Sequence, residues 1–70
     1  MRLSDADRKI LKVLRRSKKP LSTYEIAKQA KVMWSTANSH CYKLKSMNLI
    51  DSKTESSKFG LGEKIVWWIK

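Results

Sequence analysis

Two helical patterns lie close together in residues 21–50, LSTYEIAKQAKVMWSTANSHCYKLKSMNLI, and their spacing constrains the fold more than any other feature of the chain. The first begins with a capping signal, because Ser22 is followed three residues later by Glu25, and it predicts a short helix that ends at Gln29 or Ala30. The second predicts a helix over residues 35–47. Because few residues separate the two patterns, we expect two helices joined by a tight turn.

Another helix is predicted before this pair, from about Asp5 to about Ser17. Ser4 and Asp7 resemble a capping box at its start, and Pro20 disfavours helical geometry just beyond its end. Apolar residues share one face of this helix, and the opposite face is basic. We therefore expect the fold to bury the apolar face.

After Ile50 the helical periodicity gives way to a strand pattern. Polar residues and both glycines separate a short run at residues 49–53 from an aromatic, β-branched run at residues 65–69, which predicts a β-hairpin with a long tip. Successive side chains of a strand point to opposite sides, so Trp67 and Trp68 should face different ways. We expect the side of Trp67 to face the core.

Seventy residues suit one domain, spanning residues 1–70, with a small core. The predicted fold class is α+β, mainly α, with three helices followed by the hairpin. Cys41 is the single cysteine and excludes an internal disulfide, and the longest apolar run, IVWWI, is far shorter than a membrane-spanning helix. We therefore expect a soluble, cytoplasmic protein with no membrane partner.

The chain is strongly basic, with 16 Lys and Arg residues against 6 Asp and Glu residues, a formal net charge of +10 and a pI of about 10.1. A polyanion is the natural partner, and both nucleic acid and an anionic membrane surface meet that requirement. The membrane is the weaker candidate, because the fold itself needs the apolar face of the first helix.

The last of the predicted helices, residues 35–47, carries many short polar side chains. With Cys41 at the centre of the buried stripe, a period of about 3.6 residues places Ala37, Leu44 and Asn48 near it, with His40 at the edge of the stripe. The opposite side and its flank collect Ser35, Thr36, Asn38, Ser39, Tyr42, Lys43 and Ser46. Such side chains let a helix lie close to base edges in a major groove, although a serine-rich face is more often simply solvated.

Residues 21–50 resemble the winged helix-turn-helix core of small bacterial and archaeal transcription regulators. The resemblance rests on the EIA motif at residues 25–27, on Leu44, and on the step NLI at residues 48–50 into the wing. Asn48 stands where Gly is common, and Asn also tolerates the left-handed conformation that ends helices.

This resemblance implies three helices followed by a β-hairpin wing, and it implies roles for particular residues. The exposed face of the third helix would enter the major groove of double-stranded DNA, which assigns DNA contacts to Ser35, Thr36, Asn38, Ser39, Tyr42 and Lys43. The wing would lie along the backbone or minor groove, which assigns contacts to Lys53, Lys58 and Lys64. The protein would then be nucleoid-associated.

His40 and Cys41 are neighbours, but adjacent helix residues point about 100° apart and cannot easily share one task. The chain offers no second candidate base and no glycine-rich phosphate loop, and one Cys with one His is too few for a structural zinc site. We therefore expect no catalytic residues, no metal and no cofactor. Cys41 is interpreted as a core residue, and His40 as a residue that makes one hydrogen bond.

The leading hypothesis is a sequence-specific transcription regulator that binds double-stranded DNA as a homodimer, with Trp67 and Trp68 at the dimer interface. A second hypothesis is a sequence-indifferent architectural DNA binder that uses charge alone. A third is a winged-helix interaction module whose basic face meets an acidic protein through the tryptophans. Without any partner, one tryptophan would pack in the fold and the other would lie half covered at the surface.

Overall fold

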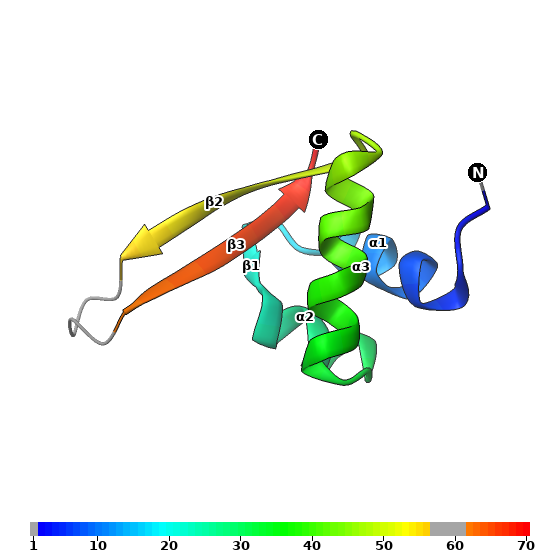
Figure 1. Cartoon of the computed structure of the whole chain (residues 1–70), viewed down its shortest axis with the longest axis horizontal. Coiled ribbons are helices and arrows are strands. Elements are labelled where there is room, and N and C mark those ends of the chain that lie inside the picture. Colours follow the sequence, from blue (N-terminus) through cyan, green and yellow to red (C-terminus); the bar gives the residue numbers. More distant parts are fainter. Residues whose placement is uncertain (1, 57–61) are drawn as a thin grey trace.

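The computed structural model describes residues 2–56 and 62–70. Its elements, in chain order, are α1 (Asp5–Arg16), β1 (Leu21–Ser22), α2 (Thr23–Ala30), α3 (Trp34–Ser46), β2 (Ile50–Ser56) and β3 (Glu63–Ile69). The three helices pack together, and β2 and β3 extend from them to one side (Figure 1). Among the described residues, no helix has both the length and the hydropathy to cross a membrane.

The N-termini of α1 and α2 are held by capping boxes, as their sequences predict. At α1 the Asp7 amide donates to Ser4 Oγ at 3.1 Å, and the Ser4 amide donates to Asp7 Oδ2 at 2.9 Å. At α2 the Glu25 amide donates to Ser22 Oγ, and the Ser22 amide donates to Glu25 Oε1. Each box satisfies two backbone donors that the first turn of a helix leaves without intrahelical partners.

The tight turn between α2 and α3 begins at Lys31, which has a left-handed φ of 58°. The step from α3 into β2 uses a second left-handed residue, Asn48, with φ of 63°. Asn therefore takes the conformation that Gly would supply at the end of a helix. The predicted ends of all three helices are within about one residue of those observed.

The sheet has three antiparallel strands in the order β1-β3-β2. The hairpin pairs Ile50 with Ile69 at its base and Ser56 with Glu63 at its outer end, so β2 runs three residues further than the sequence indicated. The two-residue strand β1 was not predicted. Leu21 and Ser22 carry no strand periodicity, and they become a strand only because they meet Trp67 and Val66 of β3.

The core lies between the helices and one face of the sheet. Trp67, Ile10, Ile26, Leu44 and Cys41 are among its fully buried side chains. The indole Nε1 of Trp67 donates to Thr23 Oγ1 at 2.8 Å, so its one polar group is satisfied inside the protein. The orientation predicted for Trp67 and the core position of Cys41 are both confirmed.

One part of the predicted dimer interface is therefore wrong. Trp67 has an exposed fraction of 0%, which leaves no surface for contact with a second copy. Trp68, its neighbour on the other side of β3, is half-buried. Both residues are aromatic and adjacent, and only the packing of the helices on one side of the sheet distinguishes them.

Candidate nucleic-acid interface

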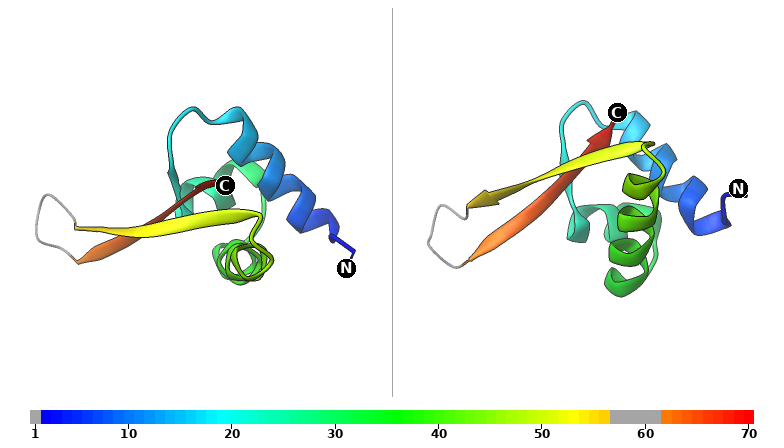
Figure 2. Two further views of the ribbon diagram at one scale, coloured as in Figure 1. Left: turned by 90° about the horizontal axis from the view of Figure 1, so that it is seen from above. Right: turned by 45° about the horizontal axis from the view of Figure 1, so that its top comes forward.

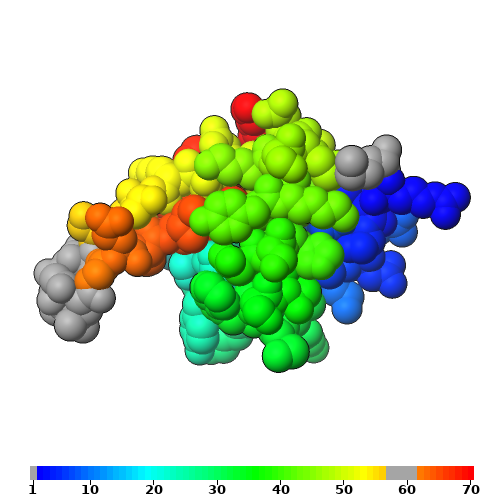
Figure 3. Space-filling view, viewed as in Figure 1, coloured from blue at the N-terminus to red at the C-terminus, as the bar shows by residue number. Residues whose placement is uncertain are grey.

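Helix α3 forms the central part of one face of the molecule, and the hairpin projects to one side of it (Figure 3). Its buried stripe is Ala37, Cys41 and Leu44, as the helical period indicates. The position predicted for Asn48 on this stripe is wrong, because the helix ends at Ser46 and the left-handed Asn48 beyond it is exposed. On its outward side Ser35, Ser39 and Tyr42 are exposed, while Thr36 and Asn38 on its flanks are half-buried. The predicted DNA-contacting residues thus share one helix, but they are not equally open to a partner.

The N-terminus of α3 differs from those of the other two helices. Its N-cap residue, Met33, makes no side-chain capping hydrogen bond, and its first turn has no acidic residue. The first-turn amides and the positive end of the helix dipole are therefore left without a side-chain partner of the kind that caps α1 and α2. This is the local chemistry that accommodates a phosphate group.

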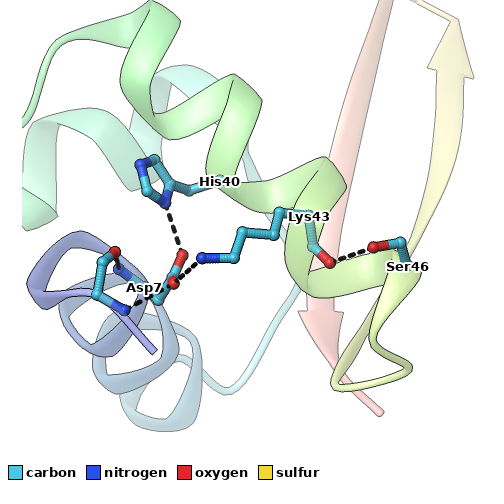
Figure 4. Close-up of polar contacts among 5 residues, drawn as sticks. Asp7, His40, Lys43 and Ser46 are labelled. Atoms are coloured by element: carbon cyan, nitrogen blue, oxygen red, sulfur yellow. Dashed lines mark hydrogen bonds and ion pairs between the residues drawn. The ribbon is translucent and has the colours of Figure 1, made fainter. Parts of the chain in front are cut away.

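Lys43 does not point freely outward, although the sequence places it with the DNA-contacting residues. Its Nζ donates to Asp7 Oδ2 at 2.7 Å, and His40 Nδ1 lies 2.6 Å from Asp7 Oδ1 (Figure 4). The Asp7 carboxylate is fully buried and joins the start of α1 to the middle of α3. Lys43 therefore serves the α1–α3 contact, and the single hydrogen bond expected of His40 is confirmed.

The pKa of Asp7 reflects these contacts. Burial raises it, but hydrogen bonds from Lys43, from the Ser4 backbone and from His40 outweigh burial and hold the pKa well below its usual range. The carboxylate is therefore the form that the folded protein favours. The Asp7 carboxylate therefore both caps α1 and helps to orient α3.

Tyr42 belongs partly to the core. Its ring meets the Trp67 ring edge-to-face, with centroids 5.1 Å apart, while 51% of the residue remains exposed. This contact holds the ring against the sheet and restricts where the hydroxyl can reach. Tyr42 is therefore a preorganised side chain on the outer surface of α3.

The three wing lysines do not lie together. Lys64 is exposed near the outer end of β3, and it borders a hollow of about 360 Å³ with Tyr24 and Trp34. Lys53 is exposed on β2, but it borders a different groove together with Trp68. Lys58 lies outside the described residues. Only Lys64 is therefore seen next to the start of α3.

Large apolar side chains are exposed at the start of α2 and α3, and the sequence analysis assigned none of them to the interface. Tyr24, Met33 and Trp34 are 66%, 74% and 55% exposed, and Tyr24 and Trp34 line the hollow beside Lys64. Helical spacing could have indicated Tyr24, because it lies about 160° around the helix from the buried Ile26. These side chains extend the candidate interface from α3 towards the wing.

The thiol of Cys41 takes no part in this surface. It is fully buried, and burial raises its pKa to about 12, so the thiolate is not formed near neutral pH. The Cys41 side chain therefore acts as a small apolar group that fills space in the core.

Comparisons with solved structures found the same arrangement of helices and strands elsewhere. The chain is similar to a possible transcriptional regulator from Methanosarcina mazei Go1 over 97% of its own length, with 20% sequence identity and a TM-score of 0.84. It spans only 57% of that protein. No protein-family model and no curated protein matched the sequence.

Two further structures are similar at somewhat higher identity. A PadR family transcription regulator from Clostridium difficile R20291 shares 25% identity, covering 96% of this chain and 73% of that one, with a TM-score of 0.78. The apo-Zalpha of zebrafish PKZ shares 27% identity, covering 90% of this chain and 88% of that one, with a TM-score of 0.74. The element order and the agreement over nearly the whole chain give this protein the winged helix-turn-helix fold, with β2 and β3 as its wing.

Proposed function

We propose that this protein binds double-stranded DNA as a sequence-specific transcription regulator, with α3 in the major groove and the wing on the backbone. The observation that carries the proposal is the outer surface of α3. Ser35, Ser39 and Tyr42 are exposed there, next to a helix N-terminus that has no side-chain cap. Hydroxyl groups on such a surface can reach base edges, while the free amides favour a phosphate.

The charge of the chain supports the same proposal. A net charge of +10 on 70 residues supplies the sequence-independent attraction that DNA binding requires. Lys64 beside α3 contributes to that attraction in our proposal, and Lys43 contributes less because Asp7 already neutralises it. The fold's occurrence in transcription regulators adds to this support.

Selection from a pool of random duplexes, followed by binding measurements, tests the proposal. The selected duplex and a scrambled duplex of equal length are compared by fluorescence anisotropy over a series of salt concentrations. Tighter binding to the selected duplex supports a regulator, and equal binding supports a sequence-indifferent architectural protein. Absence of binding to either duplex would reject DNA as the partner and favour an interaction module.

A homodimer on a two-fold-related DNA site stays a prediction. Trp67 is buried and cannot contribute to it, so Trp68 alone remains of the predicted interface. Arg15, Lys18, Lys19 and Lys53 surround Trp68, and their charge opposes the close approach of a second copy through that surface. Sedimentation equilibrium of the wild-type protein, with and without the selected duplex, decides the question.

A further inference from the structure

A basic groove with an apolar floor lies where α1, the segment between α1 and β1, and the sheet come together. Its apolar lining comes from Leu14, Pro20, Trp68 and Ile69, and its cations are Arg15, Lys18, Lys19 and Lys53. No acidic side chain is among the described residues that line it, and its volume is about 580 Å³. We call this site the Trp68 groove.

The segment that forms one wall of the Trp68 groove is held in shape. Ser17 Oγ donates to the Lys19 carbonyl at 2.6 Å and accepts from the Lys19 amide at 3.3 Å. Pro20 then fixes the backbone before β1, which is tied to β3 through Leu21 and Trp67. The lysines of this wall are therefore presented from a defined backbone.

The Trp68 groove is on the other side of the sheet from α3. Helix α3 lies on one side of β3, and the connection between α1 and β1 lies on the other, in both views of Figure 2. Alternation along the strand gives the same result, because Trp67 faces the core that α3 covers and Trp68 faces away. A duplex held by the outer surface of α3 would leave this groove accessible.

We propose that the Trp68 groove binds an acidic peptide segment of a partner protein, with a large apolar side chain seated on Trp68. Four cations around an apolar floor call for several carboxylates that flank an apolar group, and an acidic segment supplies both. A second copy of this chain is disfavoured, because it would bring further cations to the same place. Duplex DNA would satisfy the cations but would leave the apolar floor without a partner.

The test uses a fluorescein-labelled peptide with a phenylalanine between two runs of three aspartates. Fluorescence anisotropy is measured at about 150 mM salt, where long-range attraction between exposed charges is largely screened. We expect saturable binding of this peptide. Binding should weaken when serine replaces the phenylalanine and should be lost when asparagines replace the aspartates. Equal affinity for the phenylalanine and serine peptides would overturn the proposal, because the apolar floor would then have no role.

Variants of the protein locate the site. Lys18→Glu combined with Lys19→Glu should weaken the peptide about tenfold or more, because two attractive charges become repulsive. The control combines Lys9→Glu with Lys12→Glu, which changes the net charge equally at exposed positions of α1 outside the groove, and it should weaken the peptide about threefold or less. An equal loss in both double variants would overturn the proposal.

Trp68→Ala tests the floor. It should remove the advantage of the phenylalanine peptide over the serine peptide, and Trp68→Phe should restore most of that advantage. Circular dichroism establishes that each variant is folded before its affinity is compared. If the advantage survives in folded Trp68→Ala, the apolar side chain does not sit on Trp68 and the proposal fails.

Backbone amide shifts in nuclear magnetic resonance spectra place the peptide directly. The largest changes should fall at residues 14–19, at Lys53 and at Trp68, with little change in α3. Three results would each overturn the proposal. The shift changes could centre on α3, or an excess of unlabelled duplex could displace the peptide. The wild-type protein could also form a dimer that Trp68→Ala dissociates, which would assign the groove to a second copy. Peptide binding does not require DNA binding, so each proposal can fail while the other stands.

Discussion

The two sides of α3 use polar side chains in different ways. On the side that faces α1, His40 and Lys43 both end on the buried carboxylate of Asp7, at 2.6 and 2.7 Å. On the outer side, the hydroxyls of Ser35 and Ser39 make no side-chain hydrogen bond with another residue of the described part of the chain. The first set is used by the fold, and the second is exposed to solvent.

The difference teaches how to interpret polar residues on one helix. A buried polar group must be paired within the protein, because leaving it without a partner costs free energy. An exposed group has water as its partner and can exchange it for a ligand. Mutations on the two sides should therefore separate stability from binding.

The largest effect is expected on the α1 side. Asp7→Ala removes the capping box of α1 and leaves His40 and Lys43 without their partner, so the free energy of unfolding should fall by about 2–4 kcal/mol. This fall is smaller than the loss expected on breaking a fully buried ion pair, because the side chains of His40 and Lys43 are 27% and 36% exposed and solvent weakens their attraction to Asp7. Urea unfolding followed by circular dichroism measures the change.

The control for this variant is Asp5→Ala, which removes an exposed acidic residue from the same first turn. It should change the free energy of unfolding by about 0.5 kcal/mol or less. If the two alanine variants are equally stable, the contact between α1 and α3 does not hold the fold in the way described.

The next effect is expected on the outer side of α3. Ser39→Ala combined with Tyr42→Phe should reduce the preference for the selected duplex over the scrambled one by about 1–3 kcal/mol for each real base contact. Phenylalanine is chosen because it keeps the ring contact with Trp67. Stability should change little, and anisotropy titrations with both duplexes give the preference.

A double variant that loses affinity for both duplexes equally would assign these hydroxyls to backbone contacts. A large loss of stability in the same variant would instead show that the outer side belongs to the fold, and the comparison between the two sides would break down.

The dependence of stability on pH should arise from the α1 side. The folded protein holds the pKa of Asp7 below its usual value, which is about 3.9 in unfolded chains, so the unfolded state binds the proton more readily. The contribution of the carboxylate is then fully present above about pH 4 and is lost as the pH falls below that value. Urea unfolding at several pH values measures the slope.

Asp7→Asn keeps the size of the side chain and removes its titration. The free energy of unfolding of this variant should depend less steeply on pH between about 2 and 4 than that of the wild type. Identical slopes in the two proteins would mean that other carboxyl groups cause the acid sensitivity.

The smallest effect is expected from the wing lysines. Lys64→Ala should weaken both duplexes by a similar, modest factor and should reduce the salt dependence of binding by about one phosphate contact. Lys53→Ala removes an equal charge from the Trp68 groove and should leave that dependence nearly unchanged. The slope of log affinity against log salt is measured for both variants. A larger change in Lys53→Ala than in Lys64→Ala would place the duplex on the wing nearer to Lys53, at the Trp68 groove.

The sequence alone determined the parts of the fold that depend on neighbouring residues. The capping boxes at Ser4 and Ser22, the buried stripe of α3 and the hairpin all follow from spacing and from local hydrogen-bonding chemistry. Net charge likewise needs no structure. Enough of the pattern was local for the winged helix-turn-helix fold to be predicted.

Only the tertiary structure decided which side chains those elements leave exposed. Asp7 appeared in the sequence as a capping residue, yet it also binds His40 and Lys43, which lie 33 and 36 residues further along the chain. Segments distant in sequence also decide three other features. They form strand β1 by pairing it with β3, they bury Trp67, and they bring the cations of the Trp68 groove together. Periodicity indicates which face of an element turns inward, but a long side chain at the edge of that face takes its partner from whatever packs beside it.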